Sequence, residues 1–218
     1  MKDFISLSLI FLSIFFISCD KKSKTGDCCK KDNITTKTTT NVKSDITLFD
    51  ITSPWTTQDG KTLKLSDFKS KVILMAMIFT NCEGACPRIT ADLLRIEQSI
   101  PKEKLKDVSF VLVTMDPWRD NPQQLKSFAK EYQLDPTRWT LLTGSESDIL
   151  EISNVLNVRI KKDANGNFDH SNIIHVLNHK GNIVYQQIGL NIEPTESLNA
   201  INQLFINCIL LNNTTIPN

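Results

Sequence analysis

The chain has 218 residues, of which 40% are hydrophobic and 22% are charged, and its formal net charge is +1. This balance leaves no excess of positive charge for a nucleic-acid partner, so we expect none. The length is sufficient for a leader and for one domain with a hydrophobic core of its own.

The N-terminus has the pattern of an export signal. The apolar run Phe4–Ile17 is shorter than the roughly 20 residues of a membrane span and fits the apolar region of a secretory signal. The residues Ser18–Asp20 follow it and resemble a bacterial lipobox, in which the cysteine is lipidated and becomes the mature N-terminus. We therefore predict a lipoprotein signal peptide over residues 1–18 and a lipid on Cys19. Ordinary secretion with cleavage nearby is the alternative.

Either reading predicts an exported protein, and no other segment of the sequence could span a membrane. With the lipid, the protein is anchored to a bacterial membrane and its domain lies in the periplasm or cell-envelope space. Residues 19–45 are rich in Lys, Thr, Asp and Asn and are predicted to form a flexible tether. The adjacent Cys28 and Cys29 in this tether are expected to be incidental. Residues 46–212 are predicted to form one domain, followed by a tail at 213–218.

The predicted domain alternates strands with helices. An Asp59-Gly60 turn within Thr56–Leu65 predicts a hairpin, and apolar runs without polar alternation predict buried central strands. Proline in a first turn and a serine N-cap mark helix starts. After the hairpin we predict strand Val72–Phe79, helix Ala91–Gln98, strand Val108–Met115, helix Pro122–Tyr132, strand Trp139–Thr143, helix Glu146–Leu156 capped by Ser145, the hairpin strands Asn172–Asn178 and Ile183–Gln187, and helix Glu196–Leu210.

This order of elements predicts the fold class. Strands that alternate with helices indicate an α/β sheet covered on both faces, and a final antiparallel hairpin followed by a helix is what a thioredoxin-like fold requires. We predict a thioredoxin-like fold with a central mixed sheet, helices on both faces and an N-terminal hairpin. Cys208, in the closing helix, is expected to be a small core residue.

Cys82 and Cys86 follow the predicted strand Val72–Phe79 and precede a helix. Unpaired backbone N–H groups and the helix dipole favour thiolate over thiol at such a turn. Export makes a structural disulfide one interpretation, but a loop this short adds little stability. A redox-active pair, a soft-metal site or both explain the placement better.

His170 is the candidate partner of the two thiols. Thioredoxin-type oxidoreductases have Cys-x-x-Cys and a facing cis-proline, whereas this chain has Cys-x-x-x-Cys and no proline between Pro136 and Pro194. His170 occupies the facing position, in a loop expected to fold back over the thiols just before the strand Asn172–Asn178.

Two thiolates and one imidazole suit copper, and the count of three favours copper over zinc, which in structural sites usually has four ligands. Water could still supply a fourth ligand to zinc. The chain has three histidines. We expect His175 to be structural or on the outer face of its strand, and His179 to be solvated in a turn.

Several motifs of the chain recur together, and in the same order, in a known family. They are Phe79-Thr80-x-Cys82-x-x-x-Cys86-Pro87, then Asp116-Pro117-x-Arg119-Asp120-x-Pro122 with Leu125, then Trp139–Gly144, and Asp169-His170-Ser171 before a strand with a turn at Gly181. On these motifs, residues 45–190 resemble the Sco (SenC-type) family of copper-binding, thioredoxin-like proteins.

The resemblance implies a site for one copper ion made by Cys82, Cys86 and His170. It also implies a role in delivering copper to, or reducing the thiols of, the dinuclear copper site of cytochrome c oxidase. Glu83 and the turn Asn178–Gly181 depart from the usual family residues, and neither touches a proposed ligand.

The segment after the strand Val108–Met115 carries further candidates. Asp116 lies at the strand's C-terminal end, where sites gather in α/β sheets, and is predicted to orient the copper ligands without binding the ion. We expect Arg119 and Asp120 to serve in ending the strand and capping the next helix. Trp118 is expected to be a packing residue or an exposed contact.

These observations favour a membrane-tethered metallochaperone. Its expected partners are a copper-accepting oxidase subunit or another copper protein, a thiol reductant, and the membrane through the lipid anchor. The alternative is a thiol–disulfide reductase in which Cys82 attacks and Cys86 resolves, so enzymatic activity is left open. A copper or redox sensor is a third reading that the sequence does not distinguish from the first.

Overall fold

The computed structural model describes residues 46–163 and 168–213, with side chains as far as residue 207. The predicted signal peptide, the lipidated Cys19, the tether and its Cys28 and Cys29 all lie outside the described residues. So does the side chain of Cys208, although its backbone belongs to the last helix.

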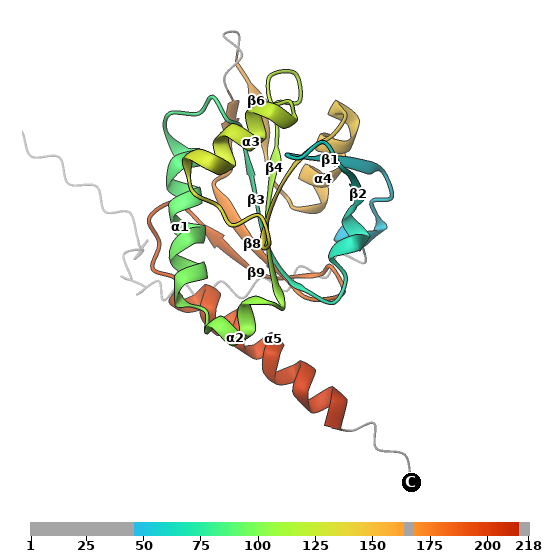
Figure 1. The fold of residues 1–218 in the computed structure, drawn as a ribbon, viewed down its shortest axis with the longest axis vertical. Helices are drawn as coiled ribbons and strands as arrows, with labels where there is room; N and C mark the ends of the chain where they lie inside the picture. Colours follow the sequence, from blue (N-terminus) through green and yellow to red (C-terminus); the bar gives the residue numbers. More distant parts are fainter. Residues whose placement is uncertain (1–45, 164–167, 214–218) are drawn as a thin grey trace, which may run out of the picture. The chain divides into compact units, whose positions relative to one another are not determined.

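A seven-stranded mixed sheet forms the centre of the fold, with the strand order β2-β1-β5-β4-β3-β8-β9 (Figure 1). The three central strands β5, β4 and β3 are parallel to one another, and the other pairings are antiparallel. The strands are β1 (Pro54–Thr57), β2 (Thr62–Lys64), β3 (Val72–Ile78), β4 (Val108–Thr114), β5 (Trp139–Thr143), β8 (Ile173–Leu177) and β9 (Ile183–Ile188).

Helices cover both faces of this sheet, which confirms the predicted thioredoxin-like arrangement and its N-terminal hairpin. The crossovers between parallel neighbours place α1 (Ala85–Ser99) and α3 (Pro122–Glu131) on one face, where α5 (Thr195–Asn213) contacts α1. The helix α4 (Glu146–Val155) lies on the other side (Figure 1). Short turns complete the chain: η1 (Leu48–Asp50), η2 (Leu65–Phe68) and α2 (Lys102–Leu105).

Local sequence explains where these elements begin. All seven side chains of β3 are buried, as its unbroken apolar run predicts. Ser145 caps α4 and forms a capping box with Asp148, as expected. The cap of α3 is Asn121, whose side chain accepts a hydrogen bond from the backbone N–H of Gln124. The expectation that Asp120 would serve as that cap is therefore wrong.

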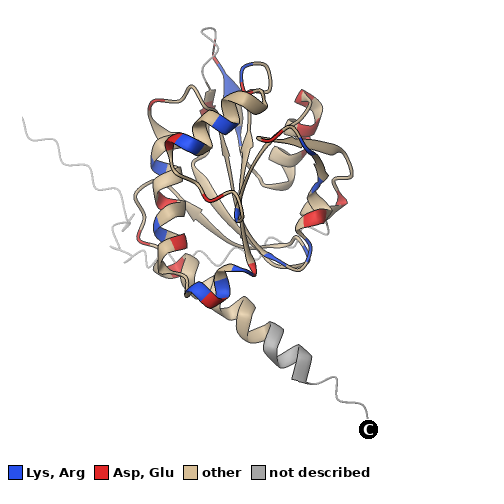
Figure 2. Cartoon of the chain, in the orientation of Figure 1, with Lys and Arg blue, Asp and Glu red and all other residues tan. Residues whose placement is uncertain are grey.

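The charged residues avoid the centre of the sheet. Figure 2 shows β3, β4 and β8 without Lys, Arg, Asp or Glu, while α1, α2 and α3 carry charges of both signs. Among the described residues, no helix combines the length and the apolar character that crossing a bilayer requires.

A second, two-stranded sheet carries one predicted site residue. Strand β6 (Ile160–Lys162) pairs antiparallel with β7 (Phe168–His170), and Ile160 lies opposite His170. The sequence analysis predicted a loop here. It missed both strands because each is only three residues long and charged side chains interrupt the apolar pattern.

Candidate metal and redox site

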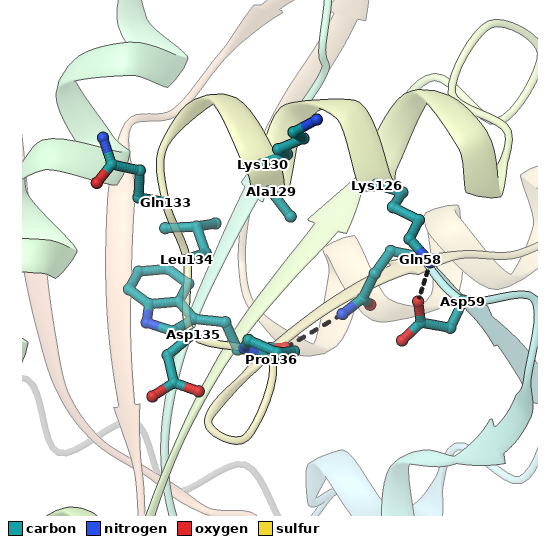
Figure 3. A pocket seen from close by; sticks show the side chains of 10 residues that line it. Gln58, Asp59, Lys126, Ala129, Lys130, Gln133, Leu134, Asp135 and Pro136 are labelled. Carbon is teal, nitrogen blue, oxygen red and sulfur yellow. Dashed lines mark hydrogen bonds and ion pairs between the residues drawn. The ribbon is translucent and has the colours of Figure 1, made fainter.

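A surface pocket beside α3 is not the site that the sequence predicts. It lies between α3 and the β1–β2 turn (Figure 3), and none of Cys82, Cys86, His170 or Asp116 lines it. Two of its polar side chains have partners: Lys126 Nζ lies 2.9 Å from Asp59 Oδ1, and the Gln58 side chain bonds to the backbone of β5.

The predicted site residues gather at one edge of the main sheet. The C-terminal half of β3 pairs with the start of β8, so that Ala76 lies opposite Ile174. The thiol-bearing loop that leaves β3 and the segment around His170 that enters β8 therefore meet at the same edge. Asp116 follows β4, which runs parallel to β3 and ends at this edge as well.

Cys82 is the more accessible of the two thiols. It is half-buried in the turn before α1, and its sulfur accepts a hydrogen bond of 3.5 Å from the backbone N–H of Cys86. Partial burial opposes ionisation of this thiol, but the backbone N–H groups of Cys86, Gly84 and Ala85 outweigh burial and lower its pKa. The prediction that the helix start favours a thiolate is thus confirmed for Cys82.

Cys86 has the opposite character, and the same prediction is wrong for it. The side chain is fully buried in the first turn of α1, and its sulfur accepts a hydrogen bond of 3.4 Å from the backbone N–H of Phe79. Burial raises its pKa strongly, and the nearby charges of Cys82 and Asp120 raise it further. Both cysteines are free thiols in this structure. The pair therefore combines one thiol poised to ionise with one held protonated.

His170 is held in a state that suits a metal ligand. Its half-buried ring has Nδ1 at 3.2 Å from the backbone carbonyl of Ser171. Because a carbonyl only accepts, Nδ1 carries the proton and the lone pair is on Nε2. Burial lowers the pKa of this imidazole, against smaller opposing effects of Ser171 and Asp169, so the ring is neutral at physiological pH.

These groups do not yet form a complete metal site. Within the part of the chain that the structure describes, no three His, Cys, Asp or Glu side chains lie close enough together to hold a metal ion. The two thiols are neighbours, and Phe79 touches both the thiol loop and the His170 ring. The third candidate donor, His170, lies at the same edge of the sheet but does not form a three-ligand cluster with the two thiols.

The remaining histidines have no role at this edge. His175 is fully buried in β8, where Nε2 lies 2.8 Å from the carbonyl of Leu156 and Nδ1 lies 3.3 Å from that of Met75. Burial lowers its pKa to about 4, so it is a neutral structural histidine, as expected. His179 is partly exposed in the β8–β9 turn.

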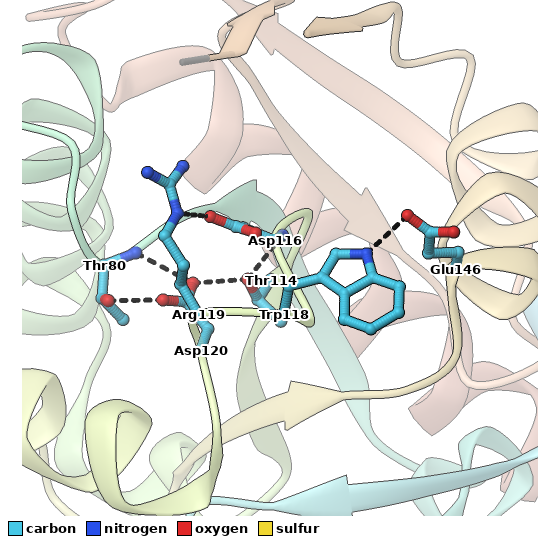
Figure 4. A network of polar contacts seen from close by, with 7 residues as sticks. All are labelled: Thr80, Thr114, Asp116, Trp118, Arg119, Asp120 and Glu146. Atoms are coloured by element: carbon cyan, nitrogen blue, oxygen red, sulfur yellow. Dashed lines mark hydrogen bonds and ion pairs between the residues drawn. The ribbon is translucent and has the colours of Figure 1, made fainter. Parts of the chain in front are cut away.

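Asp120 is a residue of the site region whose function the sequence analysis missed. Its buried carboxylate accepts hydrogen bonds from the backbone N–H and the hydroxyl of Thr80 and from the hydroxyl of Thr114 (Figure 4). It therefore ties the thiol loop, two residues before Cys82, to the end of β4. The sequence signal for it was its place in the motif Asp116-Pro117-x-Arg119-Asp120, from which only a cap for α3 was predicted.

Asp116 and Trp118 flank this network. Asp116 is buried, and its Oδ2 accepts a hydrogen bond from Nε of Arg119, while its Oδ1 has no hydrogen-bond partner among the described residues. No hydrogen bond joins this carboxylate to the thiols or to His170. Trp118 is 74% exposed, and its Nε1 donates to Glu146 at 2.7 Å (Figure 4). It is an exposed contact and not a packing residue.

Comparison with known proteins identifies this combination of fold and motifs. A sequence model described as SCO1/SenC matches residues 46–205 of the chain. In the curated relatives that the chain also matches, the aligned stretch covers between 38% and 64% of their length.

Solved structures agree. A SCO1/SenC family lipoprotein from Bacillus anthracis is 33% identical, with a TM-score of 0.65 over 70% of this chain and 92% of that one. A second structure is that of BsSco, a member of the Sco family of cytochrome c oxidase assembly proteins in which a disulfide switch was identified. It is 30% identical, with a TM-score of 0.61 over 70% of this chain and 90% of that one.

A third structure, Bradyrhizobium japonicum ScoI with copper bound, shares the fold at 24% identity and a TM-score of 0.58, over 69% of this chain and 94% of that one. The matched region covers most of the chain, and it includes the thiol pair, Asp116, Asp120 and His170. The chain belongs to the SCO1/SenC family.

Proposed function

We propose that the protein binds one copper ion through Cys82, Cys86 and His170 and passes it to a partner, as a membrane-anchored chaperone. The observation that carries this proposal is the pairing of two unlike thiols with a neutral imidazole whose Nε2 is available, all at one edge of the sheet. The client is the dinuclear copper site of cytochrome c oxidase or a related copper enzyme. Two findings support this choice of client: membership of the SCO1/SenC family, and the similarity to BsSco, which belongs to a family of cytochrome c oxidase assembly proteins.

The donor set fits copper by its chemistry. Thiolates select soft ions such as copper(I), and imidazole suits copper in either oxidation state. The carboxylate of Asp120 is saturated by Thr80 and Thr114, so it is not free to bind a harder ion at this edge. Copper is the cargo here, and the protein's part is to hold it and release it.

Transfer begins at the accessible ligand. Cys82 is half-buried and ionises readily, so it is the thiolate that an incoming ligand from the partner can displace. Cys86 is fully buried and stays with the domain. Asp116, buried beside Arg119, orients this edge from outside the ligand set.

The redox state of the pair gates binding. Joining the two thiols in a disulfide removes both sulfur ligands, and the two electrons and two protons pass to an oxidant such as a partner disulfide, which becomes a pair of thiols. A thiol reductant then restores the binding form. The lipid on Cys19 and the tether over residues 19–45 keep this cycle at a bacterial membrane, in the periplasm or cell-envelope space.

The test is copper binding by the reduced protein. We expect copper(II) to produce a thiolate-to-copper charge-transfer band, and His170→Ala to weaken copper(II) binding about tenfold or more by removing one of three ligands. His179→Ala, which removes a histidine away from this edge, is the matched control. An unchanged band and affinity in His170→Ala would show that the assigned ligand set is wrong.

A thiol–disulfide reductase is the second candidate, favoured by the asymmetry of the thiols. Cys82, with its lowered pKa, would attack a partner disulfide and release one partner thiolate. Cys86 would then attack Cys82 and release the second, leaving the protein oxidised. In copper-free conditions, Cys86→Ser should accumulate a mixed disulfide with a partner if this is the main activity. A variant that traps nothing from a reconstituted oxidase subunit speaks for the chaperone.

A further inference from the structure

Phe79 contacts both cysteines through its backbone. It is the first residue after β3, and its N–H donates to the sulfur of Cys86 at 3.4 Å. Its carbonyl accepts a hydrogen bond of 3.2 Å from the N–H of Cys82. The backbone of this one residue therefore helps to position both cysteines.

The ring of Phe79 contacts the other half of the site. Its centroid lies 5.2 Å from the ring of Phe168 and 6.1 Å from the ring of His170, which it meets edge-on at 80°. Phe168 and His170 are alternate residues of β7, so they share one face of that strand, while Asp169 between them is exposed. The inner face of β7 thus rests on Phe79, and such aromatic contacts have preferred geometries.

The strand that carries His170 has few other lateral supports. In the described residues β7 pairs only with β6, and the pair stands apart from the seven-stranded sheet. Its hydrogen bonds at Ser171 run within the hairpin, to Arg159, and the next main-chain bond, from Gly189 to the carbonyl of Asn172, holds the entry to β8. None of the main-chain hydrogen bonds that Phe79 makes to the two cysteines reaches β7. The buried ring of Phe79 is the contact between the thiol loop and the His170 ring.

We propose that Phe79 is a positioning residue of the copper site, which sets the reach of His170 toward Cys82 and Cys86 without binding the ion. The inference rests on the proposed ligand set and adds how that set is held together. Phe79 acts through His170, because its ring touches that side chain while its backbone bonds survive any change of side chain. Loss of the ring should therefore loosen the histidine and leave the thiols in place.

The experiment is a double-mutant cycle on the full, reduced protein, read by competition of copper(II) with a chelator of known affinity. Phe79→Leu keeps an apolar side chain but removes the ring, and we expect it to weaken copper(II) binding about tenfold, the lower end for outer-shell groups. In the His170→Ala background the same substitution should have no further effect, since the group it positions is absent. Phe110→Leu is the matched control, because it also removes a buried stacked ring, against Trp139, far along β4 from the thiols.

Two further readouts separate positioning from general destabilisation. In the copper(II) form, Phe79→Leu should reduce the nitrogen hyperfine splitting of the electron paramagnetic resonance spectrum, whereas Phe110→Leu should not. In the copper-free form, it should shift the ring proton resonances of His170. If Phe79→Leu does not fold, Phe168→Leu, at the half-buried partner of the same contact, should give the same pattern.

The outcomes distinguish this inference from the proposed function. If His170→Ala is silent, the ligand set itself is wrong. If His170→Ala weakens binding but Phe79→Leu and Phe168→Leu leave the affinity and the nitrogen splitting unchanged, only the positioning role is overturned. Additive losses in the double variant would also overturn it, because they would mean that Phe79 acts through the thiols.

Discussion

The thiol loop and the His170 hairpin are the two halves of the proposed copper site, but they are built differently. The loop that begins at Phe79 joins a fully buried strand to a helix of fifteen residues; Asp120 anchors the loop at Thr80, and the backbone N–H of Phe79 donates to Cys86 in the first turn of that helix. The hairpin of β6 and β7 has three residues in each strand and stands outside the main sheet. Its aromatic contact with Phe79 links it to the loop.

This difference bears on how the proposed copper site would exchange its ion. A site whose donors were all fixed by the main sheet would hold its ion in one geometry. Here two sulfurs are fixed, and the imidazole is carried by an element with fewer constraints. In the proposed transfer the partner first displaces Cys82, and the less constrained imidazole can follow while the fold stays intact.

The largest expected contrast lies within the loop itself. We expect a thiol-alkylating reagent to modify Cys82 roughly 100-fold faster than Cys86 at neutral pH, because Cys82 is accessible with a lowered pKa whereas Cys86 is buried and protonated. Peptide mass spectrometry assigns the modified residue. The rate for Cys82 should reach half its maximum at a lower pH than for a free cysteine. Equal rates for the two thiols would contradict the asymmetry on which both proposed activities depend.

The second contrast is between a histidine held by the sheet and one held by the hairpin. Burial lowers the pKa of His175 to about 4, below the value of roughly 6.5 in an unfolded chain. As the pH falls, the unfolded chain therefore takes up a proton first. The contribution of His175 is complete above about pH 6.5 and is lost progressively toward pH 4, by about 3 kcal/mol in all.

Urea unfolding at several pH values measures this effect. His175→Gln should flatten the dependence of the free energy of unfolding on pH between about 6.5 and 4. His170→Gln should change it less, because His170 is only half-buried. A larger change in this pH dependence for His170→Gln than for His175→Gln would mean that the hairpin packs against the rest of the fold more tightly than its strand pairing indicates.

The smallest expected effect concerns the link between the loop and β4. Asp120→Asn keeps the shape of the side chain but replaces one acceptor oxygen by a donor, so one of the donors of Thr80 and Thr114 loses its partner. We expect a loss of about 2 kcal/mol in the free energy of unfolding. Asp59→Asn, which breaks an exposed ion pair with Lys126, is the control and should cost less than about 1 kcal/mol. Equal losses in the two variants would show that Asp120 does not anchor the loop.

Much of the architecture could be predicted from local pattern. The strand Trp139–Thr143 has the predicted bounds, and β3, β4 and α4 differ from their predicted bounds by a residue at one end. Long apolar runs, a proline in a first turn and a Ser145 cap are strong signals, because each acts over a few neighbouring residues. The short strands β6 and β7 carry no such signal, since their pairing depends on a partner across a loop.

The sequence by itself determined the fold class, the family motifs and the candidacy of Cys82, Cys86 and His170, because each follows from residue type and spacing. Only the tertiary structure decided how deeply these groups are buried and how readily each of them ionises. Burial and backbone N–H groups separate the two thiols, although both precede or begin the same helix. Contacts between residues far apart in sequence, from Thr80 to Asp120 and from Phe79 to His170, fix the loop and the hairpin. Such contacts depend on how the elements pack, which no local pattern records.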